Sequence, residues 1–106
     1  MFARSVSFHL KPGRVADFTK LIDKDIIPML RKQKGFQDEI AFVTPGGTDA
    51  VGISVWDVKE NAETYGRTGY TNVLNALKDV IEGTPQVKTY EVCSSTFTKT
   101  PVHATA

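Results

Sequence analysis

Residues 2–10, Phe-Ala-Arg-Ser-Val-Ser-Phe-His-Leu, carry the clearest structural signal in the sequence. Apolar side chains alternate here with small or polar ones: Phe2, Val6, Phe8 and Leu10 against Ala3, Ser5, Ser7 and His9. This two-residue period is that of a β-strand with one face in a hydrophobic core. Arg4 interrupts the apolar face, and the turn-forming residues 11–13, Lys-Pro-Gly, end the strand.

The next segment has helical spacing from about residue 14. Its apolar positions fall on one stripe: Val15, Phe18, Ile22, Ile26, Met29 and Leu30. Pro28 lies inside this pattern, and proline removes one backbone hydrogen bond of a helix. We therefore expect the helix to kink or split near Ile27.

Two strands, about 36–44 and 50–56, follow on either side of the permissive turn 45–49, Pro-Gly-Gly-Thr-Asp. A second helical region is predicted over 59–65. Gly66 and Gly69 are expected to interrupt it, and it resumes near Tyr70 with its stripe at Tyr70, Val73, Leu74, Leu77 and Ile81. Residues 83–85, Gly-Thr-Pro, stop the helix, and a fourth strand is predicted over 86–97.

This order predicts an α+β domain of the ferredoxin-like βαββαβ class over residues 1–97, followed by a polar tail, 98–106. The sheet is four-stranded and antiparallel, with both helices on one face and strands one and three at its centre. The helix side is expected to carry Val6, Phe8, Leu10, Val51, Ile53 and Val55. The open side is expected to carry Ala3, Ser5, Ser7, His9, Gly52, Ser54 and Trp56.

The predicted open face carries mostly small side chains at its centre, with no Lys, Arg, Asp or Glu. A sheet face in water usually displays longer charged side chains, whereas small ones let another layer approach closely. We therefore predict a homodimer in which the two sheets meet face to face. A monomer with a weakly polar solvent face is the alternative.

Composition narrows the classes of partner. The 106 residues are 41% hydrophobic and 24% charged with a net charge of +1, and there is no long basic run, so a nucleic-acid partner is not expected. No apolar run approaches the roughly 20 residues of a membrane span, and the start lacks a secretory signal, so a cytoplasmic protein is predicted. Cys93 lies in the predicted fourth strand as a core residue, and two separated histidines predict no metal site.

Two segments carry a family resemblance: residues 27–36, Ile-Pro-Met-Leu-Arg-Lys-Gln-Lys-Gly-Phe, and residues 55–62, Val-Trp-Asp-Val-Lys-Glu-Asn-Ala. Both resemble the antibiotic biosynthesis monooxygenase family. The resemblance implies a dimeric α+β barrel with a ligand cavity between the sheet and the helices of each subunit. It also implies an oxygenase that needs no metal or flavin cofactor and acts on a small quinol-like or anthrone-like aromatic.

The haem-degrading branch of that family uses an Asn, a Trp and a His at places that Val6, Tyr65 and Asn75 occupy here. Haem degradation is therefore disfavoured. Many other members carry a His at the place of Tyr65, so chemistry that depends on histidine is in doubt as well. A non-catalytic dimer that binds a small apolar metabolite is the alternative function, and whether the chain is an enzyme stays open.

The candidate catalytic residues are Tyr65 and Arg4. Tyr65 could donate a hydrogen bond to a developing oxyanion, or instead hold its hydroxyl in water on a helix surface. Arg4 points to the helix side, where an unpaired charge is costly, so it could bind an anionic oxygen. The alternatives for Arg4 are a carboxylate partner at the sheet edge or a path to solvent.

The candidate substrate-binding residues are Trp56, Tyr70, Asn72 and Asn75. Trp56 could wall a flat pocket, although an anchor between two sheets is favoured for it. Packing is favoured for Tyr70, and solvent exposure for the two asparagines. His9 could be a general base, but its strand position favours a hydrogen-bonded residue of the open face.

Overall fold

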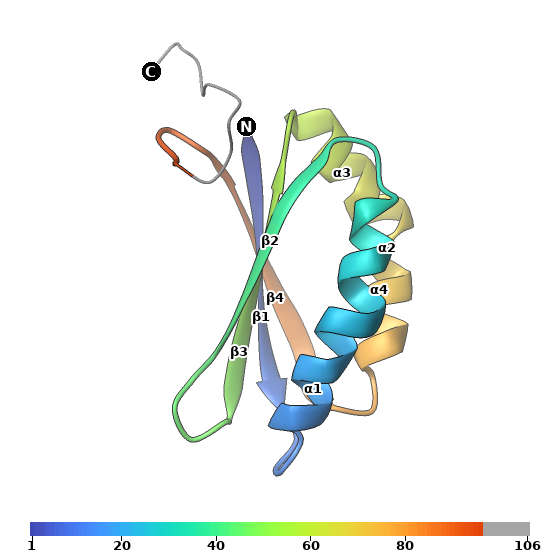
Figure 1. Ribbon diagram of the computed structural model, residues 1–106, viewed down its shortest axis with the longest axis vertical. Coiled ribbons are helices and arrows are strands. Elements are labelled where there is room, and N and C mark those ends of the chain that lie inside the picture. Colours follow the sequence, from blue (N-terminus) through green and yellow to red (C-terminus); the bar gives the residue numbers. More distant parts are fainter. Residues whose placement is uncertain (97–106) are drawn as a thin grey trace.

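A computed structural model describes residues 1–96 of the chain. It has two layers, a four-stranded sheet and a set of helices packed on one of its faces (Figure 1). The elements in chain order are β1 (Phe2–Leu10), α1 (Val15–Leu21), the π-helical turn η1 (Ile22–Ile26), α2 (Ile27–Arg31), β2 (Phe36–Val43), β3 (Asp49–Trp56), α3 (Lys59–Thr68), α4 (Tyr70–Leu77) and β4 (Ile81–Glu91).

The sheet has the strand order β2-β3-β1-β4, and every neighbouring pair is antiparallel. This arrangement confirms the predicted ferredoxin-like class, with β1 and β3 at the centre. The β2–β3 hairpin turns where predicted, and Gly46 and Gly47 there adopt φ values of 98° and 75°. Such positive φ values suit glycine, which has no side chain to clash.

Pro28 splits the first helical region as predicted. It is the second residue of α2, and the helical region changes from π-helical to α-helical pitch directly before it, near Ile27. The five residues of η1 precede it in the wider π-helical spacing. Ile22 and Ile26 remain buried across this turn, so the apolar stripe survives the change of helical pitch.

The second helical region breaks at one glycine, not two. Gly69 separates α3 from α4, whereas α3 runs through Gly66 to Thr68. The prediction of a break at Gly66 is therefore wrong. A β-carbon built on Gly66 would lie 3.5 Å from Nε of Arg4, an ordinary van der Waals distance, so the Arg4 side chain packs against this part of α3.

The prediction that Val51, Ile53 and Val55 of β3 face the helices is wrong. Val6 pairs with Gly52 and Arg4 with Ser54, and residues opposite each other on antiparallel strands share a face. Gly52, Ser54 and Trp56 therefore face the helices, and Val51, Ile53 and Val55 face the other way. The physical reason is the bulk of Trp56, which is 0% exposed and fills the space between β3 and α3.

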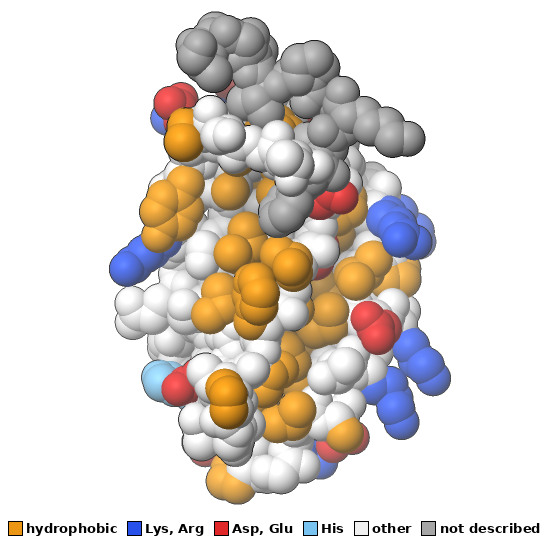
Figure 2. All heavy atoms as spheres, turned by 60° about the vertical axis from the view of Figure 1, so that its left-hand side comes forward, with side chains coloured by type: hydrophobic (Ala, Val, Ile, Leu, Met, Phe, Trp, Pro, Cys, Tyr) orange, Lys and Arg blue, Asp and Glu red, His pale blue; other side chains and the backbone are white. Residues whose placement is uncertain are grey.

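The open face is consequently more apolar than predicted. Ala3, Ser5, Ser7 and His9 lie there as expected, and β3 adds Val51, Ile53 and Val55. β2 adds Ile40 and Phe42, whose side chains remain 39% and 51% exposed. Figure 2 shows hydrophobic side chains gathered on this side of the molecule, away from the helices.

The fourth strand begins earlier and ends earlier than predicted. β4 starts at Ile81, which pairs with Leu10 instead of extending the helix. The pairing skips residues 83–85 opposite Phe8, so the Gly-Thr-Pro run forms a bulge within an edge strand, where proline is tolerated. Cys93 lies beyond β4 and is exposed, so its prediction as a core strand residue is wrong.

The predicted tail, 98–106, and the predicted strand end at residue 97 lie outside the described residues. Within residues 1–96, no helix combines the length and apolarity needed to cross a membrane.

Candidate functional site

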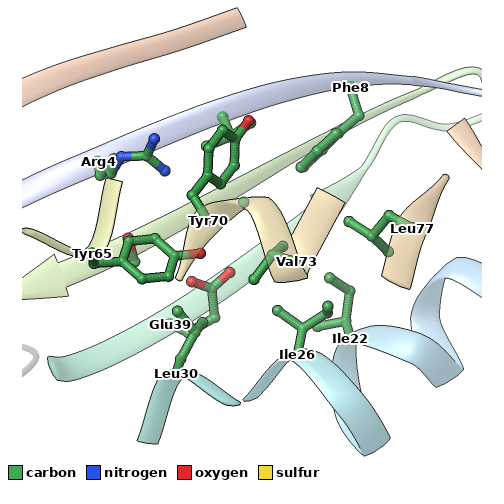
Figure 3. A pocket seen from close by; sticks show the side chains of 13 residues that line it. Arg4, Phe8, Ile22, Ile26, Leu30, Glu39, Tyr65, Tyr70, Val73 and Leu77 are labelled. Atoms are coloured by element: carbon green, nitrogen blue, oxygen red, sulfur yellow. The ribbon is translucent and has the colours of Figure 1, made fainter. Parts of the chain in front are cut away.

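A small cavity lies between the sheet and the helices (Figure 3). Its walls are mainly apolar: Val6, Phe8, Ile22, Ile26, Leu30, Val73 and Leu77. Its polar groups come from five different elements: Arg4, Glu39, Ser54, Tyr65 and Tyr70. An apolar cavity with a few convergent polar groups is the usual form of a small-molecule site.

Arg4 is the most unusual residue of the cavity. Its side chain is 8% exposed, and its guanidinium carbon lies 4.1 Å from the ring centre of Tyr70 and 5.3 Å from that of Tyr65. Among the residues that the structure describes, its guanidinium forms no hydrogen bond and no ion pair. Burial lowers the pKa of Arg4, whereas Tyr65 and Tyr70 raise it. The cavity therefore holds a cation with unused hydrogen-bond donors.

The Tyr65 ring contacts Arg4 and also belongs to a cluster of aromatic rings. Its ring lies on Trp56 with centroids 4.9 Å apart and an interplanar angle of 26°, and Tyr70 meets it edge-on at 6.3 Å. Burial is the main cause that raises the pKa of Tyr65, and Glu39 and Tyr70 add to it while Arg4 opposes it. Burial also raises the pKa of Tyr70. Both hydroxyls therefore stay protonated near neutral pH and can donate hydrogen bonds.

Trp56 lies behind Tyr65 and does not line the cavity. Its indole N–H donates a 2.9 Å hydrogen bond to the Ser54 hydroxyl, and its ring also meets Phe36. The favoured expectation of an anchor between two sheets is wrong, because Trp56 packs on the helix side. Its contact with Tyr65 makes it a support that orients the tyrosine ring.

Glu39 is the cavity residue that sequence reasoning missed. It belongs to β2, and one of its carboxyl oxygens would lie 3.2 Å from a β-carbon on Gly52. Burial raises the pKa of Glu39 to about 8. The available signal was strand alternation, since Glu39 lies between two open-face positions, Asp38 and Ile40, and therefore points to the helix side.

The cavity is narrow, with a volume of about 30 Å³. This volume holds a water molecule or two and no aromatic ligand. It shares Ile22 and Glu39 with a wider groove of about 280 Å³ between η1 and β2. A ligand that enters from this groove must displace side chains. The groove is bordered by the η1 turn, and π-helical turns are frequent at functional sites.

The other predicted residues lie elsewhere. Asn72 and Asn75 are exposed on α4 and do not line the cavity, whereas Tyr70 does. His9 lies on the open face, where its Nδ1 and a carboxylate oxygen of Asp49 are 2.6 Å apart. Within residues 1–96, no group of three or more His, Cys, Asp or Glu side chains is placed to hold a metal ion.

Comparison with known proteins places this geometry in context. The sequence matches no protein-family model and no curated protein. Solved structures match closely in shape. An antibiotic biosynthesis monooxygenase candidate from Bordetella bronchiseptica aligns with a TM-score of 0.74 and 14% identity, over 88% of this chain and 97% of the other. The chain has the fold of the antibiotic biosynthesis monooxygenases.

Two further structures have this monooxygenase fold. The monooxygenase ActVA-Orf6 of Streptomyces coelicolor, solved with nanaomycin D, aligns with a TM-score of 0.72 and 18% identity, covering 89% of this chain and 88% of the other. SnoaB, a cofactor-independent oxygenase from Streptomyces nogalater, aligns with a TM-score of 0.71 and 15% identity, covering 90% of this chain and 95% of the other. The monooxygenase fold predicted from the sequence is thus confirmed.

Proposed function

We propose that this chain is a cofactor-independent oxygenase of a small aromatic substrate of the quinol or anthrone type. The observation that supports it most is the buried Arg4 guanidinium, which contacts two tyrosine rings and has no anionic partner among the described residues. Burying an unpaired charge costs about several kcal/mol, and a desolvated cation–π contact offsets about 2 kcal/mol or more of this cost. An anionic ligand would remove this cost.

The proposed chemistry uses the substrate itself as the reductant of O₂. An anthrone loses a proton from its ring methylene, and the negative charge moves onto the carbonyl oxygen. Arg4 and the Tyr65 hydroxyl stabilise that oxyanion. The anion transfers an electron to O₂, the two radicals combine into a peroxide, and loss of water leaves a new carbonyl. One oxygen atom enters the product, and the other leaves as water with the two methylene hydrogens.

The structural comparisons support this proposal at the level of fold. Among the similar structures are a cofactor-independent oxygenase and a monooxygenase solved with nanaomycin D. Their sequence identities of 15% and 18% do not carry a substrate over to this chain. The cation and the two tyrosine hydroxyls of the cavity are donors of the kind that such chemistry uses, and an aromatic substrate would have to displace side chains to reach them.

We propose that the oxygenase is a homodimer formed through the open face of the sheet. The apolar residues Val51, Ile53, Ile40 and Phe42 adjoin the small residues of β1, so a second sheet can approach closely. A net charge of +1 gives little repulsion between two copies. A self-complementary face of this kind fits a twofold axis.

Oxygen consumption with a panel of anthrones and hydroquinones tests the function. We expect turnover by the wild type and a loss of about 100-fold or more in the Arg4→Ala, Tyr65→Phe double variant, because two donors to the oxyanion are removed. Arg31→Ala, which removes a positive charge from the exposed end of α2, is the control and should keep the wild-type rate. Equal rates for the wild type and the double variant would remove the proposed site.

A binding protein without turnover is the second candidate, because the same donors could bind an aromatic anion without reacting, once side chains move aside to admit it. Ligand-induced thermal stabilisation of the wild type without oxygen consumption would favour it.

A further inference from the structure

We infer that Glu39 is the proton acceptor of this site and acts together with Arg4 across the floor of the cavity. This inference rests on the proposed function and adds a residue to it. It depends first on where the two side chains lie in the sheet. Glu39 pairs with Ser54 on β3, and Ser54 pairs with Arg4 on β1. Glu39 and Arg4 therefore belong to one row of paired residues that runs across the sheet, with Ser54 of β3 between them.

The two ends of the row are separated by about the width of a fused aromatic ring system. Two strand spacings separate the backbones of Glu39 and Arg4 by roughly 10 Å. The residues between and beside them on the helix side are small, Ser54 and Gly52. No ion pair joins Glu39 to Arg4 among the described residues. A flat ring could thus touch the carboxyl at one edge and the guanidinium at the other, once the side chains that narrow the cavity to about 30 Å³ move aside toward the groove between η1 and β2.

This spacing matches a particular proton transfer. In an anthrone, the acidic C–H group and the carbonyl oxygen lie on opposite edges of the central ring. The Glu39 carboxylate takes the methylene proton, the C–H electron pair passes through the conjugated ring, and the charge ends on the oxygen at Arg4. The carboxyl then releases the proton to the groove between η1 and β2, which Glu39 also lines.

The surroundings of Glu39 set its proton affinity. The groups that face it are Tyr65 from α3, Arg4 from β1 and Tyr70 from α4 within the cavity, and Asp23 from η1 along the groove. Among the described residues, none of them forms an ion pair or a hydrogen bond with its carboxyl. Burial raises the pKa of Glu39 to about 8, which makes its carboxylate a stronger base than an ordinary one.

Proton exchange without oxygen tests the inference separately from the oxygenase function. Anthrone is incubated anaerobically with the protein in deuterated buffer, and deuterium entering its methylene group is followed by NMR. We expect exchange above the buffer rate with the wild type, and a rate lower by about 100-fold or more in Glu39→Gln. Glu63→Gln, on the exposed side of α3, is the matched control and should keep the wild-type rate.

The pH dependence and a conservative variant distinguish a proton acceptor from a structural carboxyl. The carboxyl accepts a proton only when it is ionised, so the wild-type exchange rate should rise with pH around a midpoint near 8. This rise should be absent in Glu39→Gln. Glu39→Asp keeps a carboxylate and should recover part of the rate. Alizarin is a hydroxyanthraquinone without a methylene group. It should still bind to Glu39→Gln, Glu39→Asp and Glu63→Gln.

Each outcome decides a different question. Glu39→Gln exchanging as fast as the wild type, or Glu39→Asp as slow as Glu39→Gln, overturns the role of Glu39 and leaves the oxygenase proposal standing. Exchange by the wild type without oxygen consumption overturns the oxygenase and supports the proton acceptor. Neither exchange nor oxygen consumption by the wild type overturns both.

Discussion

Replacing Arg4 with methionine is expected to make the protein more stable by about 2 kcal/mol, because an apolar side chain of similar length removes a buried and unpaired charge. The same change is expected to weaken the binding of alizarin by about 100-fold, since the oxyanion loses its charged partner. Urea unfolding at one fixed protein concentration measures the stability. An absorbance titration of the dye measures the affinity.

The opposite signs of the two effects make this variant informative. Arg31→Met is the control, because Arg31 is exposed at the end of α2, and it should leave both quantities close to the wild type. If Arg4→Met instead lowers the free energy of unfolding, the contacts of Arg4 with Tyr65 and Tyr70 stabilise the fold by more than its burial costs. Arg4 would then be a structural residue.

Introducing a lysine at Ile53 is expected to convert the proposed dimer to a monomer. Ile53 lies at the centre of the open face, between Ser5 on β1 and Ile40 on β2. A charge buried there without a partner costs about several kcal/mol, and each 1.4 kcal/mol weakens association tenfold. Sedimentation at micromolar concentration should give twice the 11.7 kDa chain mass for the wild type and the single mass for Ile53→Lys.

Val58→Lys is the matched control for this experiment. Val58 is 48% exposed just before α3 and does not belong to the sheet, so the same added charge should leave the dimer intact. A wild type that sediments as a single chain would contradict the proposed assembly. A dimeric Ile53→Lys protein would place the interface on another surface.

The sequence predicted the order of elements well because local signals dominate it. The alternation over residues 2–10 and the break at Pro28 depend only on backbone geometry and nearby residues. Local signals do not determine which side chains of β3 face the helices, because either set of its alternating side chains could face a core. The contact between Trp56 on β3 and Tyr65 on α3 settles that choice, and it forms only when the helix packs on the sheet.

The site was predictable only in part for the same reason. Arg4 was found because it interrupts an apolar face, which is a local signal. Glu39 sits in an ordinary-looking strand, and its burial follows from the helices that cover it and from the facing of β2 on β3. The bulge that moves the start of β4 to Ile81 likewise depends on its pairing with β1.

A crystal structure of the protein with bound alizarin tests the central claim most directly. We expect the ring system to lie over Gly52 and Ser54, with an oxygen within hydrogen-bond distance of the Arg4 guanidinium. A ring system bound on the open face, or one in the cavity with no contact to Arg4, would contradict it.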